Sequence, residues 1–247
     1  MSLVKKNALI TGGASGIGRS VGLRLARDRI NIAILDIDVA GARAVVEQVQ
    51  AVGCDATAVQ ADVACRADVD AAVNEVRKQL GLIQILVNSA GTAEFVPFDR
   101  MAEDQWEAMM NMHLKGAFNC TQAVMGDMIA SQWGRIVNVA SVAGLGGARG
   151  LVHYSTAKAG IIGFTKALAR ELGPMGITVN AVAPGMVDTP MLRQQGIRSV
   201  VKATVRHTPV GRVGKPEDVA GACAYLVSEE AGFCTGHVLN LNGGFYI

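Results

Sequence analysis

Three residues in the second half of the chain have types and spacing suited to moving a proton to or from a hydroxyl group: Ser141, Tyr154 and Lys158. A hydroxyl-bearing carbon releases a hydride only while its oxygen loses a proton, so the reaction needs a base, which serves as the acid in reverse. Tyrosine, with a pKa of about 10, is a weak candidate alone. Lys158 lies four residues further on, where its charge would lower the pKa of Tyr154. The same spacing also occurs in ordinary surface pairs.

A glycine-rich stretch near the N-terminus is suited to binding a phosphate group. The predicted strand 7–11 runs into Gly12-Gly-Ala-Ser-Gly-Ile-Gly18, which opens a predicted helix. Glycines there permit a sharp turn and let a pyrophosphate approach the backbone N–H groups at the helix N-terminus. The position between a strand and a helix is the context in which such a loop binds a dinucleotide.

Asp36 ends the second predicted strand and lies 18 positions beyond Gly18. A carboxylate at about this spacing accepts hydrogen bonds from the adenosine ribose and repels a 2′-phosphate. Ser15 and Ile37 are uncharged, so neither would attract that phosphate. These residues favour NAD over NADP. The alternative is that Asp36 only caps the turn before a helix beginning at Val39.

The elements that must position these residues alternate between strands and helices along the whole chain. Apolar runs predict strands over 7–11, 31–36, 56–62, 83–88, 135–141, 178–183 and 237–241. Amphipathic stretches predict crossover helices over 39–51, 66–80 and 156–172, among others. Several strands are apolar on both faces, as in a parallel sheet covered by helices. We therefore predict an α/β single-domain Rossmann fold over 1–247, with a doubly wound seven-stranded parallel sheet.

Composition narrows the partners. The 23 Lys and Arg nearly balance the 21 Asp and Glu, which argues against nucleic acid as a partner. No apolar run is long enough to span a bilayer, and the first residues lack the apolar core of a signal peptide. Five widely spaced cysteines without a C-x-x-C pair predict neither disulfides nor a metal site. We expect a cytoplasmic protein that acts on a small molecule.

The whole chain resembles the short-chain dehydrogenase/reductase family, in the group that contains 3-oxoacyl-thioester reductases and NAD-linked alcohol dehydrogenases. Six ordered motifs carry the resemblance: 11–18, 62–63, 88–91, Ser141, 154–158 and 184–189. It implies catalysis by Ser141, Tyr154 and Lys158, a nicotinamide cofactor, which Asp36 predicts to be NAD, and a homotetramer built on the helices containing 106–128 and 156–172. The cofactor contacts that it implies are Gly12, Ser15, Gly16, Ile17, Gly18, Asp36, Asp62, Val63, Asn88, Ala90, Gly91, Tyr154, Lys158, Pro184, Gly185, Val187 and Thr189. The pair Pro184-Gly185 could alternatively form an ordinary turn after a strand.

One position departs from the family pattern. Members usually carry Asn before Leu-Lys-Gly, where it anchors a water that relays protons to the lysine, and this chain has His113 there. In an α-helix Asn111 would lie about 200° away around the axis, too far to substitute. Because histidine donates, accepts and titrates, we hypothesise that His113 is a catalytic residue that conducts protons or touches substrate. The alternative is a hydrogen-bonded core histidine.

Two variable regions are expected to select the substrate. The segment 142–153 is small and mostly apolar, and 186–212 resembles the family's lid over the active site. In that lid Arg198, Lys202 and Arg206 form a positive stripe beside the apolar Ile197, Val201 and Val205. The stripe could receive a carboxylate or coenzyme A phosphates, or could be an ordinary solvated helix face.

Three functions remain open from the sequence. The first is an NAD(H)-dependent dehydrogenase that converts a secondary alcohol, with or without a carboxylate or coenzyme A group, into a ketone. The second is a 3-oxoacyl-thioester reductase, which in this family typically uses NADPH. The third is a nucleotide-sensing protein without activity, although such proteins usually lose the Tyr or Lys that this chain retains.

Overall fold

Seven short strands form one parallel sheet in the computed structural model, which describes residues 5–194 and 198–247. Each strand is parallel to its neighbours, in the order β3-β2-β1-β4-β5-β6-β7. Their bounds are β1 Asn7–Thr11, β2 Asn31–Asp36, β3 Ala56–Gln60, β4 Ile85–Asn88, β5 Gly134–Val139, β6 Ile177–Pro184 and β7 Val238–Leu241. The strand order reverses between β1 and β4, so the predicted doubly wound seven-stranded sheet is confirmed.

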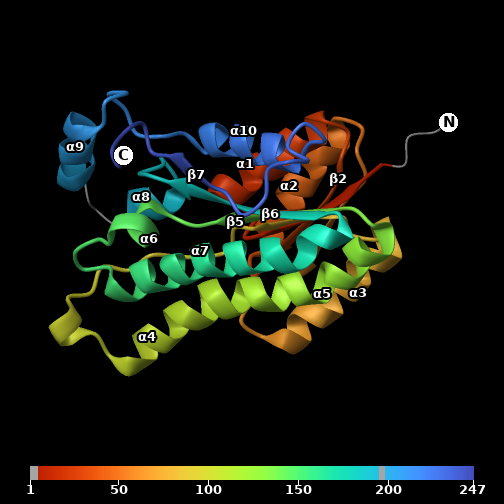
Figure 1. The fold of residues 1–247 in the computed structure, drawn as a ribbon, viewed down its shortest axis with the longest axis horizontal. Coiled ribbons are helices and arrows are strands. Elements are labelled where there is room, and N and C mark those ends of the chain that lie inside the picture. Colours follow the sequence, from red (N-terminus) through yellow and green to blue (C-terminus); the bar gives the residue numbers. More distant parts are fainter. Residues whose placement is uncertain (1–4, 195–197) are drawn as a thin grey trace.

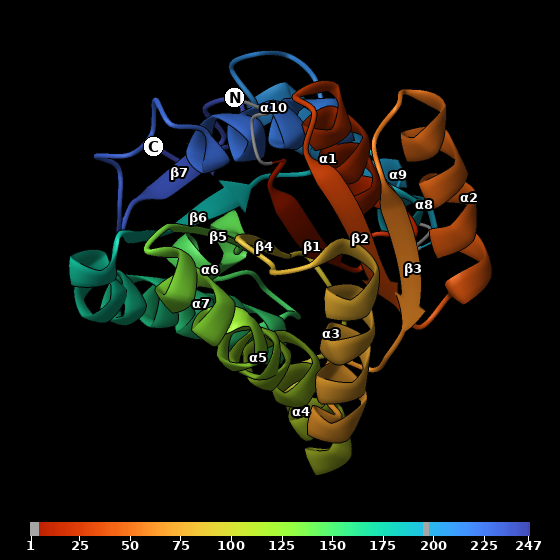
Figure 2. The same cartoon turned by 90° about the vertical axis from the view of Figure 1, so that its right-hand side faces the viewer.

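Helices cover both faces of this sheet, as Figures 1 and 2 show. One face packs against α1 (Gly16–Arg27), α2 (Val39–Ala51) and α10 (Pro216–Val227). The other packs against α3 (Arg66–Leu80), α5 (Gly116–Ser131) and α7 (Val152–Leu172). The other α-helices of the described chain are α4 (Glu103–Met110), α6 (Val142–Gly146), α8 (Pro190–Gln194) and α9 (Arg198–His207). All belong to one domain, and none of the described helices is long and apolar enough to cross a membrane.

Several predicted element ends are shifted, and at two of them a side chain takes over a backbone hydrogen bond. The strand predicted over 83–88 begins at Ile85, since the Ile83 N–H donates to Asp127 (3.0 Å). The strand predicted over 56–62 ends at Gln60, and Asp62 instead accepts the Ala64 N–H (2.9 Å). The strand predicted over 135–141 covers Gly134–Val139, that over 178–183 covers Ile177–Pro184, and that over 237–241 covers Val238–Leu241. The helix predicted over 156–172 begins at Val152 and so includes Tyr154.

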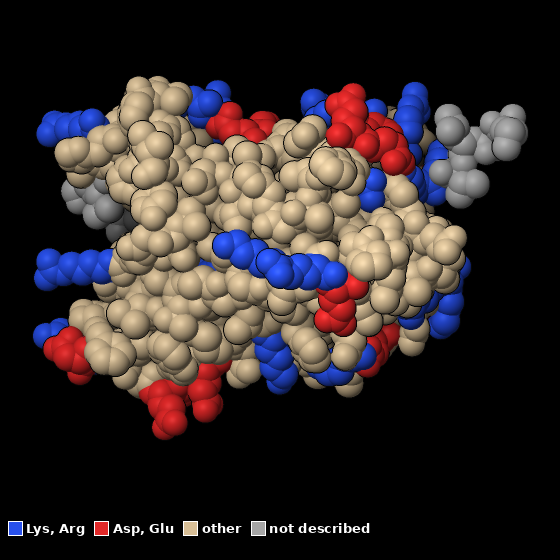
Figure 3. Space-filling model, viewed as in Figure 1, with Lys and Arg blue, Asp and Glu red and all other residues tan. Residues whose placement is uncertain are grey.

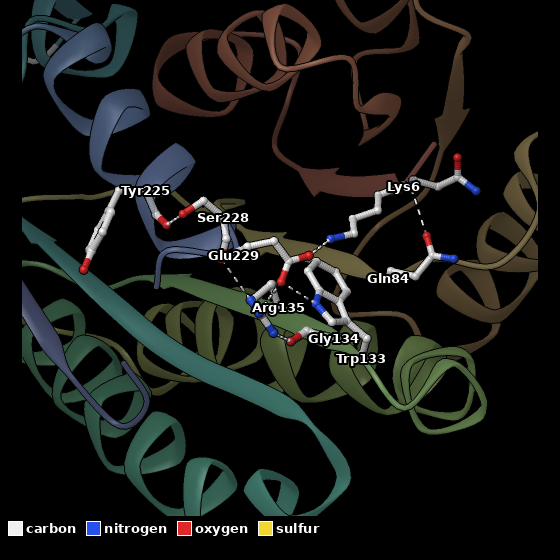
Figure 4. Close-up of polar contacts among 9 residues, drawn as sticks. Lys6, Gln84, Trp133, Gly134, Arg135, Tyr225, Ser228 and Glu229 are labelled. Atoms are coloured by element: carbon white, nitrogen blue, oxygen red, sulfur yellow. Dashed lines mark hydrogen bonds and ion pairs between the residues drawn. The ribbon is translucent and has the colours of Figure 1, made fainter. Parts of the chain in front are cut away.

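A cluster of charged side chains lies at the end of the sheet where β1 and β5 begin (Figure 4). Arg135 is only 3% exposed, and its guanidinium lies 4.3 Å from the centre of the Trp133 ring. Glu229, just after α10, pairs with Arg135 (3.5 Å) and accepts from Trp133 Nε1 (3.2 Å). Lys6, just before β1, also pairs with Glu229 and lies over the Trp133 ring. The cluster joins β1, β5 and α10 at the amino ends of the strands, opposite the carboxyl ends.

Candidate active site

A cavity of about 700 Å³ opens at the carboxyl ends of the strands. The loops after β1, β2, β4, β5 and β6 contribute to its wall, and α7 contributes Tyr154 and Lys158. In open α/β sheets the carboxyl edge at the point where the strand order reverses is where ligands bind. The fold alone therefore predicts that this cavity binds a ligand.

The glycine loop can fill its position only because Gly12 and Gly18 have no side chains. A Cβ on Gly12 would lie 2.7 Å from the Cα of Ala90, and one on Gly18 would lie 2.3 Å from the carbonyl oxygen of Gly12. Gly12 and Gly16 also have positive φ angles of 64° and 53°. The backbone thus turns tightly into the N-terminus of α1, as a cradle for a pyrophosphate requires. The backbone N–H donors at the N-terminus of α1 and the lack of side chains at these glycines fit a dinucleotide.

Asp36 both supports this loop and faces the cavity. One carboxylate oxygen accepts the Ala14 N–H (2.9 Å), and the other accepts the Asp38 N–H (3.0 Å). Asp38, rather than Asp36, caps α2 by accepting from Gly41. The alternative that Asp36 only holds a turn is therefore incomplete, because the residue also lines the cavity beside Ile37.

Nearly all the residues predicted to contact a cofactor meet at this cavity. Its wall includes Gly12, Ser15, Gly16, Ile17, Gly18, Asp36, Asp62, Val63, Ala90, Gly91, Tyr154, Lys158, Pro184, Gly185, Val187 and Thr189. Asn88 is the exception, because its side chain is buried and donates to Asn138 (2.8 Å) and Thr121 (3.3 Å). It lines a smaller cavity of about 10 Å³ with His113 and Lys158. Asn88 is thus placed to support the site rather than to face the large cavity.

Ser141, Tyr154 and Lys158 line the same cavity, at the junction of α6 and α7. Ser141 caps α6 by accepting the Ala143 N–H (3.1 Å). Lys158 donates to the carbonyl of Val139 (2.6 Å), and its Nζ lies 5.7 Å from the centre of the Tyr154 ring. A hydroxyl-bearing substrate in the cavity could therefore meet the serine and tyrosine hydroxyls together.

Burial dominates the electrostatics of Tyr154 and Lys158. Burial raises the pKa of Tyr154, and the hydrogen bond with Ser141 opposes that effect. Burial also lowers the pKa of Lys158 to about 7. That Lys158 lowers the pKa of Tyr154 stays a prediction, because burial is the largest influence on the tyrosine and the lysine is itself buried, where an ammonium is costly.

His113 lies in the wall of the cavity within an irregular helix. The segment Asn111–Lys115 between α4 and α5 is a π-helix, a form often found at functional sites. His113 is 4% exposed, whereas Asn111 is exposed, so the two residues do face different ways although the geometry is not α-helical. The His113 ring packs edge-on against Tyr154 at 5.4 Å between centroids. A Cβ on Gly91 would lie 2.1 Å from this ring, which explains the glycine there.

The hydrogen bonding of His113 indicates its protonation state. Its Nε2 lies 2.8 Å from the Thr92 carbonyl oxygen, which can only accept, so Nε2 carries a proton. Burial, aided by the charge of Lys158, lowers the pKa of His113 to about 3. Nδ1 is therefore a neutral acceptor, and it is buried without a hydrogen-bond partner in the described chain.

The predicted lid contributes α8 and α9 to the region above the cavity. Pro190, Met191 and Leu192 of α8 and Thr204 of α9 line the wall. Ile197 and the side chains of Arg198 and Lys202 lie outside the described residues, and Arg206 is exposed. The function of 186–212 as a lid and that of the positive stripe stay predictions.

The cavity wall also includes residues that were not singled out from the sequence, among them Phe95, Arg149 and Phe245. Phe95 lies in the loop after β4 and Phe245 near the C-terminus, so nothing in the local sequence indicates that both line one cavity. Arg149 had a usable signal, because it is the one charged residue in the segment 142–152.

Comparison with known proteins agrees with this geometry. A family model described as short chain dehydrogenase matches residues 6–198. The chain belongs to the short chain dehydrogenase family. Its membership makes the protein an oxidoreductase that moves a hydride between a hydroxy compound and a nicotinamide cofactor, as the resemblance implied.

Three similar proteins align with this short chain dehydrogenase over almost its whole length. The (2S)-[(R)-hydroxy(phenyl)methyl]succinyl-CoA dehydrogenase subunit BbsD of Thauera aromatica is 43% identical over 244 residues, covering 99% of this chain and 98% of that protein. The 3-oxoacyl-[acyl-carrier-protein] reductase FabG of Staphylococcus aureus is 40% identical, covering 98% of each chain. The acetoacetyl-CoA reductase of Cupriavidus necator is 39% identical, covering 99% of this chain and all of that protein.

The lowered pKa of Lys158 predicts a pH-dependent stability. Between pH about 7 and 10.5 the unfolded chain binds a proton at Lys158 that the folded protein does not, so stability rises with pH in this window. Lys158→Met should remove that rise, whereas Lys166→Met, an exposed change on the same helix, should keep it. Denaturant unfolding of the cofactor-free protein at a series of pH values measures the difference. Parallel curves for wild type and Lys158→Met would contradict the burial argument.

Proposed function

We propose that this short chain dehydrogenase is an NAD(H)-dependent enzyme that interconverts a secondary alcohol and a ketone. The observation that carries the proposal is that Ser141 and Tyr154 open onto the same cavity as the glycine loop and Asp36. The names of the similar proteins favour hydroxyacyl or oxoacyl thioesters as the class of substrate. We infer a cytoplasmic location from the cysteines, all of which are free thiols.

The proposed chemistry divides between the side chains. The nicotinamide of bound cofactor would accept or return the hydride. Ser141 donates a hydrogen bond to the substrate oxygen and holds it beside the Tyr154 hydroxyl. In alcohol oxidation the O–H proton passes to the deprotonated Tyr154 oxygen as the carbonyl forms, and in reduction the neutral Tyr154 returns it. Because burial favours neutral tyrosine, the proton on Tyr154 is ready for ketone reduction in the cavity as it stands.

The preference for NAD is supported by the charge at the adenosine end. Asp36 lies there with the uncharged Ile37, and the basic side chains among the described lining residues are Arg149 and Lys158, in the part of the chain around Tyr154. A 2′-phosphate would therefore meet a carboxylate without a compensating cation.

Replacing Asp36 by Asn and Ile37 by Arg should shift the preference toward NADP. We expect the Kd for NADH to rise and that for NADPH to fall, each by roughly tenfold, because one repulsive charge is lost and an attractive one is gained. Cofactor fluorescence titration measures both constants without a substrate. Asp38→Asn is the matched control. Asp38 lies outside the cavity wall, and asparagine there can still cap α2. A wild type that binds NADPH as tightly as NADH would refute the NAD preference.

We further propose that His113 positions the proton-transferring pair rather than carrying protons. Its pKa of about 3 keeps it neutral across the usual assay range. Its ring contacts Tyr154, and it shares with Lys158 a cavity large enough for about one water molecule. Nδ1 can accept a hydrogen bond there, as the family asparagine would through its amide oxygen.

Two variants separate the roles of Tyr154 and His113. Tyr154→Phe should lower kcat by roughly 100- to 10,000-fold, the usual contribution of a general acid or base, while NADH still binds. His113→Asn should keep most of the rate with an unshifted pH profile, because both residues supply an acceptor and His113 does not titrate in the range.

The matched comparison is His113→Leu, which fills space without an acceptor. It should lower kcat with little change in the KM for cofactor. A lost ionisation in the pH profile of His113→Asn would show that His113 does carry protons. Equal rates for the Leu and Asn variants would make it a core residue only.

A second candidate function is the reduction of 3-oxoacyl thioesters, favoured by the FabG and acetoacetyl-CoA reductase similarities. Both functions share the same residues and differ in cofactor and direction. A panel of 3-hydroxyacyl and 3-oxoacyl thioesters with simple secondary alcohols, assayed with both cofactors in both directions, discriminates them. Tight NADH binding without turnover of any compound would instead support a sensing protein.

We also propose a homotetramer built on α5 and α7, which lie side by side (Figures 1 and 2). Their outer surfaces expose Phe118 and Ile129 of α5 and Val152, Ala159 and Gly163 of α7. Uncharged side chains cover much of the face in Figure 3, and a band of Lys or Arg with neighbouring Asp or Glu crosses its middle. Light scattering should give four times the 25.8 kDa of the chain, and Ala159→Glu should lower it while Glu230→Gln should not. A monomeric wild type would refute the assembly.

A further inference from the structure

The loop between α6 and α7 places an arginine in the wall of the cavity. It joins the helices that hold Ser141 and Tyr154, and Ala148, Arg149 and Leu151 of this loop line the cavity. Arg149 is exposed, so its side chain lies where the cavity meets solvent. Arg149 lies five residues before the proton-transferring Tyr154, and both residues line the cavity.

The backbone on both sides of Arg149 is held without a ligand. The Ala148 N–H donates to the Ser155 hydroxyl (3.2 Å), which lies in α7. The Gly150 carbonyl accepts the Val96 N–H (2.9 Å) from the loop after β4. Gly150 has a φ of +74°, which a residue with a side chain rarely adopts. These hydrogen bonds therefore hold the backbone on both sides of Arg149 in place.

The guanidinium of Arg149 has no carboxylate partner in the part of the chain that the structure describes. Carboxylates on the neighbouring segments are engaged elsewhere. Glu94 accepts from the side chain of Gln105 (3.2 Å). Asp188 makes a two-point ion pair with Arg193 (2.9 and 3.0 Å). Arg149 is thus available for an external anion.

The surroundings of Arg149 make such an anion the expected partner. Apolar side chains line the cavity, among them Leu151, Met191 and Phe245, and Phe95 lies close to Gly150, next to the arginine. Binding sites of this kind use a few charged groups in an apolar wall to fix orientation and select a ligand. A guanidinium offers two parallel N–H donors, which match a carboxylate or phosphate.

We propose that Arg149 binds an anionic group of the substrate and so selects hydroxy or oxo compounds that carry negative charge away from the reacting carbon. The anion is a carboxylate on the acyl part or a phosphate of its thioester carrier. This inference rests on the proposed function, because it assigns the substrate of the same site.

Four substrates separate the two sources of charge. The first pair is a 3-oxoacyl N-acetylcysteamine thioester ending in a carboxylate and the methyl ester of the same compound. The second pair is a neutral 3-oxoacyl group on coenzyme A and on N-acetylcysteamine. The readout is, for each pair, the kcat/KM of the more negatively charged compound divided by that of its partner. It is measured for wild type, Arg149→Gln, Arg149→Lys and the control Arg100→Gln, in which an exposed arginine outside the cavity wall is replaced.

We expect Arg149→Gln to lower one of the two ratios by about tenfold or more, as for the loss of a charge-assisted hydrogen bond. Arg149→Lys should lower it less, and Arg100→Gln should leave it unaltered. A fall in the first ratio identifies a carboxylate, and a fall in the second identifies a carrier phosphate. Turnover of all four compounds with both ratios unchanged overturns the inference alone. Failure of the wild type to turn over any of the four, with either cofactor, overturns the thioester class of substrate and with it the inference, while turnover of simple secondary alcohols would leave the rest of the proposed function standing.

Discussion

The contact between the loops that follow β1 and β4 is the constraint on which the site depends. The Thr11 hydroxyl accepts the N–H groups of Ser89 and Ala90, both at 3.0 Å, and Gly12 lies so close to Ala90 that a side chain cannot fit. These loops then leave the sheet toward helices on opposite faces. The cavity forms in the opening between them, so the glycine at 12 and the reversal of strand order are two parts of one arrangement.

Most of the fold and of the cavity wall could be predicted because their signals are local. The helices over 39–51 and 66–80 have the predicted bounds, since their apolar period and the turns on either side lie within the same segment. The strand ends were less accurate. Asp127 takes the Ile83 N–H across a long sequence separation, and no periodicity within 83–88 could indicate that.

The features that could not be predicted depend on packing between distant segments. His113 was singled out from its position in a motif, but the π-helix around it and its contact with Gly91 arise only when α4, α5 and the loop after β4 meet. The lowered pKa of Lys158 could not be predicted for the same reason. Helical spacing places it near Tyr154, yet spacing says nothing about burial, and burial decides its pKa. Asn88 likewise belongs to a family motif that implies a cofactor contact. Its buried hydrogen bonds to Asn138 and Thr121 could not be predicted from that motif.

Burial acts on Tyr154 and Lys158 in opposite directions, and both shifts favour the uncharged form. The base form of Tyr154 is therefore conditional on other charges in the cavity. A positive charge brought close would lower the pKa of Tyr154, and a negative one would raise it. An anionic substrate would by itself work against alcohol oxidation. A guanidinium that pairs with the anion at the cavity opening offsets this effect, so Arg149 can admit a charged substrate while the pKa of Tyr154 stays governed by its immediate neighbours.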